Sequence, residues 1–283
     1  RTYLVSSSVM DLIRQIGALE YIRLSGTKAE DWSVKEAADL MNEGSIVYAG
    51  KYRTPDYELI LSEGCDLAVE NTMIYHDPEV KEKLEELSIP VMVETSSYEK
   101  DPRGRLEWIK LYGALYGKET EADDYFEKCE KEITSVIEMD KTGKEVAFFS
   151  VTASGSINVR KPDDYIAGLI ELAGGNYVPD ASGKAEAGGS GTVNMQMEDF
   201  YAGTYDADIL IYNSTIRGEL ESVADLAGKN PLFSDYKAVK EQNVYCMTGD
   251  FFQHPTDTAK FLSELRNLIE GKDGNYTYFE KLK

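Results

Sequence analysis

Short apolar runs alternate with amphipathic stretches through the first hundred residues. Such runs are typical of buried strands, and the stretches between them place apolar side chains at helical spacing. Ser33, followed by Glu36 three residues later, predicts a capping box at the start of one helix. The pattern predicts strands at 1–5, 22–26, 45–50, up to 70 and at 90–94, with helices at 9–16, 33–41, 55–61 and 78–87. This alternation predicts a parallel sheet with helices on both faces.

The pattern changes between Arg103 and Met139, where the chain contains no proline. From Ala122 to Ile137, apolar residues recur at helical spacing opposite a face of Glu, Asp and Lys. We expect one long helix over at least Glu107–Ile133, and a break near Gly117 stays open as the alternative. A helix over the whole stretch would be roughly 50 Å long, more than one lobe needs. This length predicts that the helix is a rigid spacer that joins the two halves of the chain.

Strand and helix signals resume after Gly143, with strands expected at 146–151, 156–160, 209–212 and 244–247. Helices are expected at 165–172, from 197, around 236–239 and at 256–269. The aromatic tail (Tyr276, Tyr278 and Phe279) is expected to dock on the rest of the chain. The predicted organisation is an N-terminal α/β lobe at 1–102, a connecting helix at 103–140 and a C-terminal α/β lobe at 141–283.

The two halves share one sequence unit. Asp66 precedes an apolar run that leads to Asn71, and Asp208 precedes another that leads to Asn213. Upstream of each run lies a helical stretch with an acid near its start, Glu58 in the first half and Glu198 in the second. The repeat favours two similar lobes, and ligand sites favour the interface between such lobes.

The composition of the chain argues against several classes of function. The chain has 283 residues and a net charge of −21. Its isoelectric point is about 4.5. This acidity argues against nucleic-acid binding, which needs a basic surface. The longest apolar runs are too short to cross a membrane. Three cysteines cannot all pair, and two histidines without nearby cysteines argue against a structural zinc site.

Motifs of catalysis are missing from the sequence. It contains no phosphate-binding glycine loop with its lysine, no Gly-x-Ser-x-Gly and no His-Glu-x-x-His. The sequence therefore predicts a binding protein rather than an enzyme, with no resident cofactor or metal.

Loops at the carboxyl ends of the predicted strands are where ligands bind in open α/β sheets. Here these loops mix aromatic, hydroxyl and basic side chains, which suits a large, partly aromatic and partly anionic ligand. Ligation of a metal or a haem by His76 or His254 stays open. The predicted ligand-binding residues are Lys51, Tyr52, Arg53, Thr72, Met73, Tyr75, His76, Ser97, Tyr98, Ser154, Ser156, Arg160, Asn213, Arg217, Phe251, Phe252 and His254.

Several segments resemble one family in its own order along the chain. They are 55–69, 111–118, 170–177, 197–211 and 237–245. In these segments the chain resembles the substrate-binding proteins of ABC importers for iron complexes, haem and cobalamin.

The resemblance implies the helical-backbone fold of periplasmic binding proteins: two Rossmann-like lobes joined by a single long helix, with the ligand in a cleft between them. It implies that Glu58 and Glu198 dock on the ABC permease, which works with its ATPase. It also implies an extracytoplasmic protein, monomeric, either free in the periplasm or held at the membrane surface as a lipoprotein by an anchor outside these residues.

Three readings stay open at this point. The first is the capture of a ferric siderophore or haem for import, with a cobalamin-type corrinoid as the alternative cargo. The second is a two-lobed α/β enzyme, such as a nucleotide-sugar transferase. The third is a surface protein that binds host haem or another protein without transport.

Overall fold

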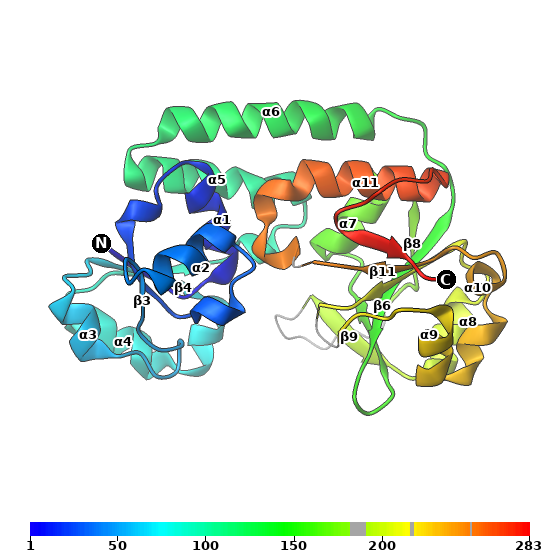
Figure 1. The fold of residues 1–283 in the computed structure, drawn as a ribbon, viewed down its shortest axis with the longest axis horizontal. Coiled ribbons are helices and arrows are strands. Elements are labelled where there is room, and N and C mark those ends of the chain that lie inside the picture. Colours follow the sequence, from blue (N-terminus) through cyan, green and yellow to red (C-terminus); the bar gives the residue numbers. More distant parts are fainter. Residues whose placement is uncertain (182–190, 216–217, 250) are drawn as a thin grey trace. The chain divides into compact units, whose positions relative to one another are not determined.

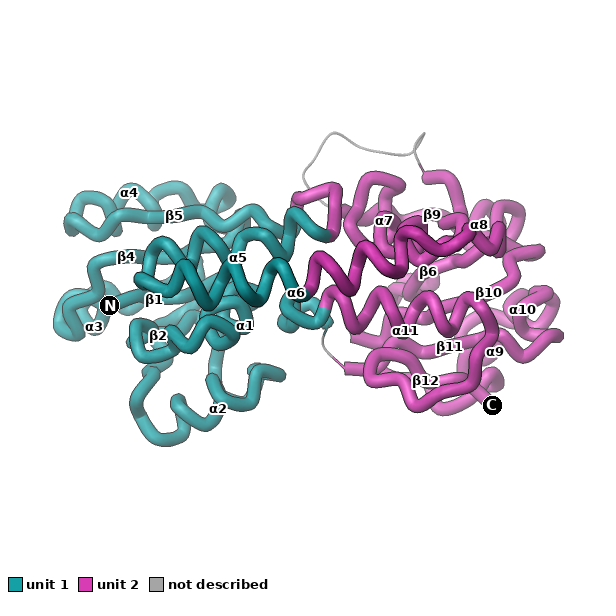
Figure 2. Tube along the Cα trace, turned by 90° about the horizontal axis from the view of Figure 1, so that it is seen from above, with its two compact units in different colours: residues 1–97, 103–128, 251–257 teal, residues 98–102, 129–250, 258–283 magenta. Residues whose placement is uncertain are grey.

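The computed structural model describes residues 1–181, 191–215, 218–249 and 251–283. These residues form two compact units (Figure 2). Unit 1 contains residues 1–97, 103–128 and 251–257, and unit 2 contains residues 98–102, 129–250 and 258–283. Each unit has its own sheet, as the repeated sequence unit predicts.

Unit 1 is built on a five-stranded sheet in the order β3-β2-β1-β4-β5 (Figure 1). All its strand pairs are parallel, which confirms the predicted parallel sheet in this half. The strands are β1 (Thr2–Leu4), β2 (Ile22–Ser25), β3 (Val47–Tyr48), β4 (Leu67–Asn71) and β5 (Val91–Glu94). The helices between them are α1 (Ser7–Gln15), α2 (Lys35–Asn42), α3 (Tyr57–Ser62) and α4 (Pro78–Glu86).

One core of unit 1 lies where α3 and α4 cover the sheet. It contains Tyr3 and Ala68 from the sheet, Ile60 from α3 and Leu84 from α4, all fully buried. Because parallel strands are covered on both faces, their residues read as continuous apolar runs. That property explains why these strands are visible in the sequence.

Unit 2 contains a seven-stranded sheet in the order β12-β11-β10-β6-β7-β9, with β8 also paired to β6. The strands are β6 (Glu145–Val151), β7 (Ile157–Arg160), β8 (Asn176–Val178), β9 (Thr192–Met195), β10 (Ile209–Asn213), β11 (Val244–Met247) and β12 (Phe279–Lys281). The β6–β7, β7–β9 and β11–β12 pairs are antiparallel and the other pairs are parallel, so this sheet is mixed, unlike that of unit 1. The tight turn from Thr152 to Ser156 is too short for a parallel crossover.

Aromatic side chains dominate the core of unit 2. Phe149 of β6 lies 4.9 Å from Phe200 and 5.3 Å from Phe233, measured between ring centroids. The tail docks as predicted, because Phe279 packs 4.9 Å from Phe261 and β12 pairs with β11. The helices of this half are α7 (Tyr165–Leu172), α8 (Met197–Thr204), α9 (Val223–Lys229), α10 (Lys237–Lys240) and α11 (Thr258–Glu270).

The predicted single long helix is wrong. The stretch forms two helices, α5 (Pro102–Tyr116) and α6 (Glu119–Ile137). Gly117 ends α5 with φ +66°, a conformation that favours glycine. A Cβ added to Gly113 would lie only 2.7 Å from that of Ala122, so the two helices pack at a close approach that needs glycine. Lys110 of α5 then lies 3.7 Å from Asp123 of α6.

The division into units also differs from the predicted boundaries. It falls inside α6, between Lys128 and Cys129, and it assigns residues 251–257 to unit 1. That short stretch forms two 3₁₀ helices, η7 (Phe251–Gln253) and η8 (Pro255–Asp257), which both pack on α1. A buried carboxylate holds this stretch on α1: Asp11 accepts hydrogen bonds from the Thr256 backbone N–H at 3.0 Å and from the Thr256 hydroxyl at 2.5 Å.

The same stretch explains why the capping box predicted at Ser33 is wrong. Helix α2 begins at Lys35 without a side-chain cap. The backbone N–H and the hydroxyl of Ser33 instead both donate to the Gln253 side-chain oxygen at 3.0 Å.

The sequence repeat occupies equivalent places in the two sheets. Strand β4 pairs with β1 and β5, and β10 pairs with β6 and β11, all in parallel. The Asp66 carboxylate accepts a hydrogen bond from the main-chain nitrogen of Arg1 at 2.7 Å, and the Asp208 carboxylate accepts one from the Glu145 backbone N–H at 2.9 Å. Each aspartate therefore binds the start of the neighbouring strand. Within the described ranges, no helix combines the length and apolar composition that a membrane crossing requires.

Candidate ligand-binding site

The strand order of unit 1 reverses between β1 and β4. The chain runs from β1 through β2 to β3 on one side, and then to β4 and β5 on the other. The carboxyl ends of the strands beside such a switch point form the usual ligand crevice of an open α/β sheet. In unit 1 the segments that follow these two strands are Ser6–Ser8 and the 3₁₀ helix η3 (Thr72–His76).

Helix η3 carries Thr72, Met73, Tyr75 and His76 of the predicted site. Its start is held by Asn71, whose side-chain oxygen accepts from the Met73 backbone N–H at 2.9 Å. Ile74 is fully buried in the core of unit 1, whereas Met73 and Tyr75 are 43% and 62% exposed. The buried isoleucine therefore anchors a short segment whose other side chains face outward.

A second predicted segment is tied to the first by an ion pair. The Nε of Arg53 lies 3.0 Å from Oδ2 of Asp77, the residue after η3. The guanidinium also lies 5.4 Å from the centroid of the Tyr52 ring, within reach of a cation–π contact. Because Asp77 follows η3 directly, this ion pair places Lys51, Tyr52 and Arg53 at the same end of unit 1 as η3. The Arg53 side chain remains 60% exposed.

A polar cluster that was not predicted from the sequence lies at this end of unit 1. The Ser6 hydroxyl donates to Oε2 of Glu94 at 2.9 Å, and the Ser96 backbone N–H donates to Oε1 at 2.6 Å. Glu94 and Ser96 are buried, while the predicted residues Ser97 and Tyr98 beside them are exposed. Three consecutive serines after an apolar run, Ser6 to Ser8, are the signal that could have revealed this cluster.

Unit 2 has its switch point between β6 and β10. The turn after β6 presents a row of hydroxyls, with Thr152 Oγ1 2.9 Å from Ser154 Oγ and Ser154 Oγ 3.4 Å from Ser156 Oγ. Ser154 is exposed at the tip of the turn. Two of the predicted residues thus lie together in this unit.

Asn213, at the end of β10, is buried and has a structural contact. Its side-chain oxygen accepts from the Thr215 hydroxyl at 2.8 Å, and so shapes the turn as Asn71 does after β4. Arg217 lies outside the described residues.

Arg160 is not brought together with the hydroxyl row. It ends β7, which runs antiparallel to β6, so it lies a strand's length away from the turn. Its guanidinium lies 3.6 Å from the Asp164 carboxylate and is largely buried.

The remaining predicted residues lie in the stretch that packs on α1. Phe251 is fully buried, and the Phe252 carbonyl accepts from Arg105 at 2.9 Å. His254 places Nδ1 3.7 Å from Oδ1 of Asp11, and donation to that carboxylate raises the pKa of the imidazole. Burial alone would raise the pKa of Asp11, but hydrogen bonds from His254, Thr256 and Arg14 hold it below its usual range. These contacts give the stretch a structural role in unit 1.

Glu58 and Glu198 occupy matching positions. Each is the second residue of the helix that precedes the repeated strand, α3 before β4 and α8 before β10. Both are exposed, and neither makes an ion pair with the rest of the described chain.

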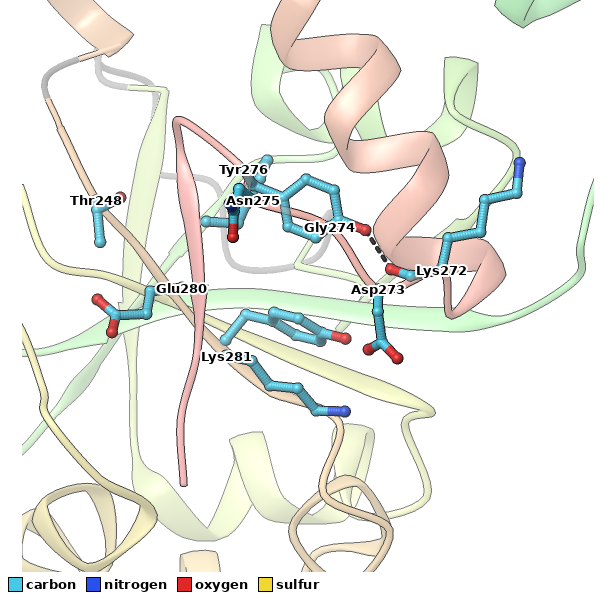
Figure 3. A pocket seen from close by; sticks show the side chains of 10 residues that line it. Thr248, Lys272, Asp273, Gly274, Asn275, Tyr276, Glu280 and Lys281 are labelled. Carbon is cyan, nitrogen blue, oxygen red and sulfur yellow. Dashed lines mark hydrogen bonds between the residues drawn. The ribbon is translucent and has the colours of Figure 1, made fainter.

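A pocket of about 380 Å³ lies elsewhere on unit 2, between β12 and the loop after α11 (Figure 3). Tyr276, whose hydroxyl donates to the Lys272 carbonyl, forms part of its wall. The pocket contains none of the predicted ligand-binding residues. Across the described part of the chain, His, Cys, Asp and Glu side chains do not gather in threes as a metal ion requires.

Known proteins resemble this chain in sequence or in structure. An uncharacterized lipoprotein of Methanocaldococcus jannaschii is 27% identical over 257 residues, which are 89% of this chain. The chain spans only 60% of that lipoprotein's length.

Two solved structures have the same fold over nearly their whole length. The periplasmic haem-binding protein of Vibrio cholerae has a TM-score of 0.73 at 16% identity, covering 94% of this chain and 98% of its own. A protein of the ABC-type Fe³⁺-hydroxamate transport system of Saccharomonospora viridis has a TM-score of 0.68 at 17% identity, covering 95% and 92%.

A family model described as periplasmic binding protein matches residues 5–250. Of the described strands, that range contains all but β1 of unit 1 and β12 of unit 2. The chain therefore belongs to the periplasmic binding protein family, which confirms the extracytoplasmic location predicted from its sequence.

Proposed function

We propose that this chain is the solute-binding component of an ABC importer and that its cargo is an iron complex, either a ferric siderophore or haem. The observation that carries the proposal is the family match over residues 5–250. Support for the cargo comes from the two structures of the same fold, one named for haem and the other for Fe³⁺-hydroxamate transport.

The exposed residues at the switch point of unit 1 fit such a cargo. Arg53 and Lys51 supply positive charge in a chain whose net charge is −21, so they attract an anionic complex. Tyr75 and Met73 supply apolar and aromatic surface beside them. In unit 2, the hydroxyls of Ser154 and Ser156 supply hydrogen-bond donors. We propose that both groups of residues contribute to binding and that neither catalyses a reaction.

Ligand titration tests this proposal directly. The full chain is titrated with haem, a ferric hydroxamate siderophore and cobalamin, with absorbance and tryptophan fluorescence as readouts. Arg53→Ala and Tyr75→Ala should each weaken binding of the iron complex. A lost charge-assisted hydrogen bond is worth about 1.5–3 kcal/mol, or roughly 10- to 150-fold in Kd.

Lys35→Ala is the matched control, since it removes an exposed cation of unit 1 that pairs with Asp39 on α2. Wild-type affinity in both test variants would reject this assignment of residues. Binding of cobalamin alone would replace the proposed cargo by a corrinoid.

The permease is the proposed macromolecular partner, and Glu58 and Glu198 are its proposed contacts. Their equivalent, exposed positions in the two units support a partner that contacts each unit at its helix before the repeated strand. Replacing both by Ala should leave ligand affinity unchanged and should sharply reduce reconstituted uptake, because complementary charges set encounter rate and register. Replacing Glu82 and Glu241, one exposed glutamate of each unit, is the control. Normal uptake with the first pair replaced would leave both acids only a favourable effect on the helix dipole.

We propose a lipid anchor as the attachment to the membrane surface. The lipoprotein of Methanocaldococcus jannaschii that covers 89% of this chain supports this attachment. Labelling of the protein in its host with a radioactive fatty acid tests it.

A further inference from the structure

Glu70 is a fully buried glutamate in the middle of the sheet of unit 1. It belongs to β4, and its Cα lies opposite that of Val93 on β5. Side chains alternate between the faces of a strand, so Glu70 shares a face with Ala68, a member of the core with Tyr3 and Ile74. The carboxyl group therefore lies in an apolar core.

Neither carboxylate oxygen of Glu70 has a hydrogen-bond partner within the described part of the chain. Glu94, one strand away and equally buried, accepts from Ser6 and Ser96. A buried carboxylate without donors costs several kcal/mol in its charged form, and such groups become neutral instead. The neutral state of Glu70 is the state that fits this core.

The phenols of Tyr3 on β1 and Tyr57 on α3 are coupled electrostatically to Glu70: burial raises the pKa of each, and a charge on Glu70 adds to that rise. Lys83 and Glu79 of α4 act on Tyr57. Burial raises the pKa of Glu70 itself to about 8, and no basic group of the described residues offsets that effect. Near neutral pH the carboxyl group therefore holds its proton.

Glu70 also lies beside the candidate ligand-binding segment. The next residue is Asn71, whose side chain holds the start of η3. Ile74 of η3 covers the same core in which Glu70 is buried. A charge on Glu70 would draw water into this core and so weaken the packing of Ile74, the buried residue by which η3 is anchored.

We propose that Glu70 binds a proton within the core of unit 1 and, while it is protonated, positions η3 for ligand binding. The carboxyl group acts through the packing of Ile74, so it is a positioning residue without contact to ligand. The proposal rests on the proposed function only in taking η3 as a ligand-binding segment.

The first test needs no ligand. The full chain is labelled with ¹³C at the glutamate carboxyl groups and titrated by NMR, as wild type, Glu70→Gln and Glu82→Gln. Glu82 lies exposed on α4 and serves as the control. One carboxyl resonance should titrate near pH 8 in the wild type and in Glu82→Gln, and should be missing from Glu70→Gln. Titration of every glutamate below pH 6 would overturn the proposal, and this readout from the wild type holds even if the variant folds poorly.

The second test follows η3 itself. Hydrogen exchange of residues 72–77, corrected for the intrinsic rate, should speed up at least tenfold between pH 6.5 and pH 9 in the wild type. It should be independent of pH in Glu70→Gln. Equal acceleration in both proteins would overturn the proposal.

The Kd for haem as the probe should rise at least tenfold over the same pH range in the wild type alone. If hydrogen exchange of residues 72–77 depends on Glu70 as expected but haem does not bind at all, the result would support the role of Glu70 and reject haem as the cargo. Equal loss of affinity in wild type and Glu70→Gln would overturn the link to ligand binding.

Discussion

Asp11 and Glu70 are both fully buried carboxylates of unit 1, yet their surroundings differ in kind. Asp11 accepts hydrogen bonds from Arg14 and Thr256 and faces His254, whereas neither oxygen of Glu70 finds a partner in the described chain. The pKa of Asp11 is accordingly held down, and that of Glu70 is raised to about 8. Burial alone therefore does not set the charge of a carboxylate; the donors around it do.

The two residues also respond to pH in opposite directions. Asp11 has a lowered pKa in the folded state, so its stabilisation is present above its unfolded pKa and is lost as pH falls through the folded pKa. Glu70 has a raised pKa, so its contribution to the free energy of unfolding is most favourable below pH 4.5 and decreases as the pH rises to about 8. Unit 1 should be most stable at mildly acidic pH.

Removing the partnered carboxylate should have the largest effect. Asp11→Ala leaves the donors of Thr256 and His254 in a buried place without an acceptor, which costs about 3–5 kcal/mol in the free energy of unfolding. The stretch 251–257 should become accessible to protease first. Urea unfolding followed by circular dichroism, together with limited proteolysis, measures both. Asp39→Ala on the exposed face of α2 is the control, and a similar small loss in both variants would contradict a special role of Asp11.

Neutralising the unpartnered carboxylate should have the opposite sign. Glu70→Gln should stabilise the protein by about 2–3 kcal/mol at pH 9. At that pH the folded wild type must either bury a charged carboxylate or keep it protonated above its pKa, and both cost free energy. The gain should vanish at pH 4, where the carboxyl group is protonated in both states. Melting temperatures measured from pH 4 to pH 9 check the trend, and destabilisation at every pH would break the comparison.

His254 should give the smallest and most local effect. Its pKa is raised by Asp11, so the stabilisation is complete below its unfolded pKa of 6.5 and is lost as pH rises through the folded pKa. His254→Gln should remove about 1 kcal/mol of stability at pH 6 and little at pH 9. Hydrogen exchange of residues 251–257 at the two pH values measures it. A loss that is the same at both would assign the histidine a packing role only.

Much of the fold is visible in the sequence for a local reason. Strands such as β4 and β10 are buried on both faces, so they read as apolar runs, and the shared spacing from Asp66 to Asn71 and from Asp208 to Asn213 marks their ends. The break between α5 and α6 is less visible. Gly113 and Gly117 stand in a helical pattern, and only the structure shows why they are needed: Gly113 lies against Ala122, and Gly117 has a positive φ.

The candidate site was harder to predict, because its residues meet through contacts far apart in the sequence. Arg53 joins η3 through Asp77, and Ser6 joins Glu94 across 88 residues. His254 resembles a loop ligand by its sequence alone, but its partner Asp11 lies 243 positions earlier in the chain. A polar residue after a strand thus indicates where a side chain is, without indicating what it contacts.

The stretch 251–257 has a consequence for the order in which the protein can mature. Unit 1 takes residues 251–257 from a point that follows most of unit 2 in the sequence. A growing chain that has reached only residue 250 leaves Asp11 without Thr256 and His254, so its α1 is still exposed to water on that side. Unit 1 therefore completes its structure only after residues 251–257 have been synthesised, which is later than most of unit 2.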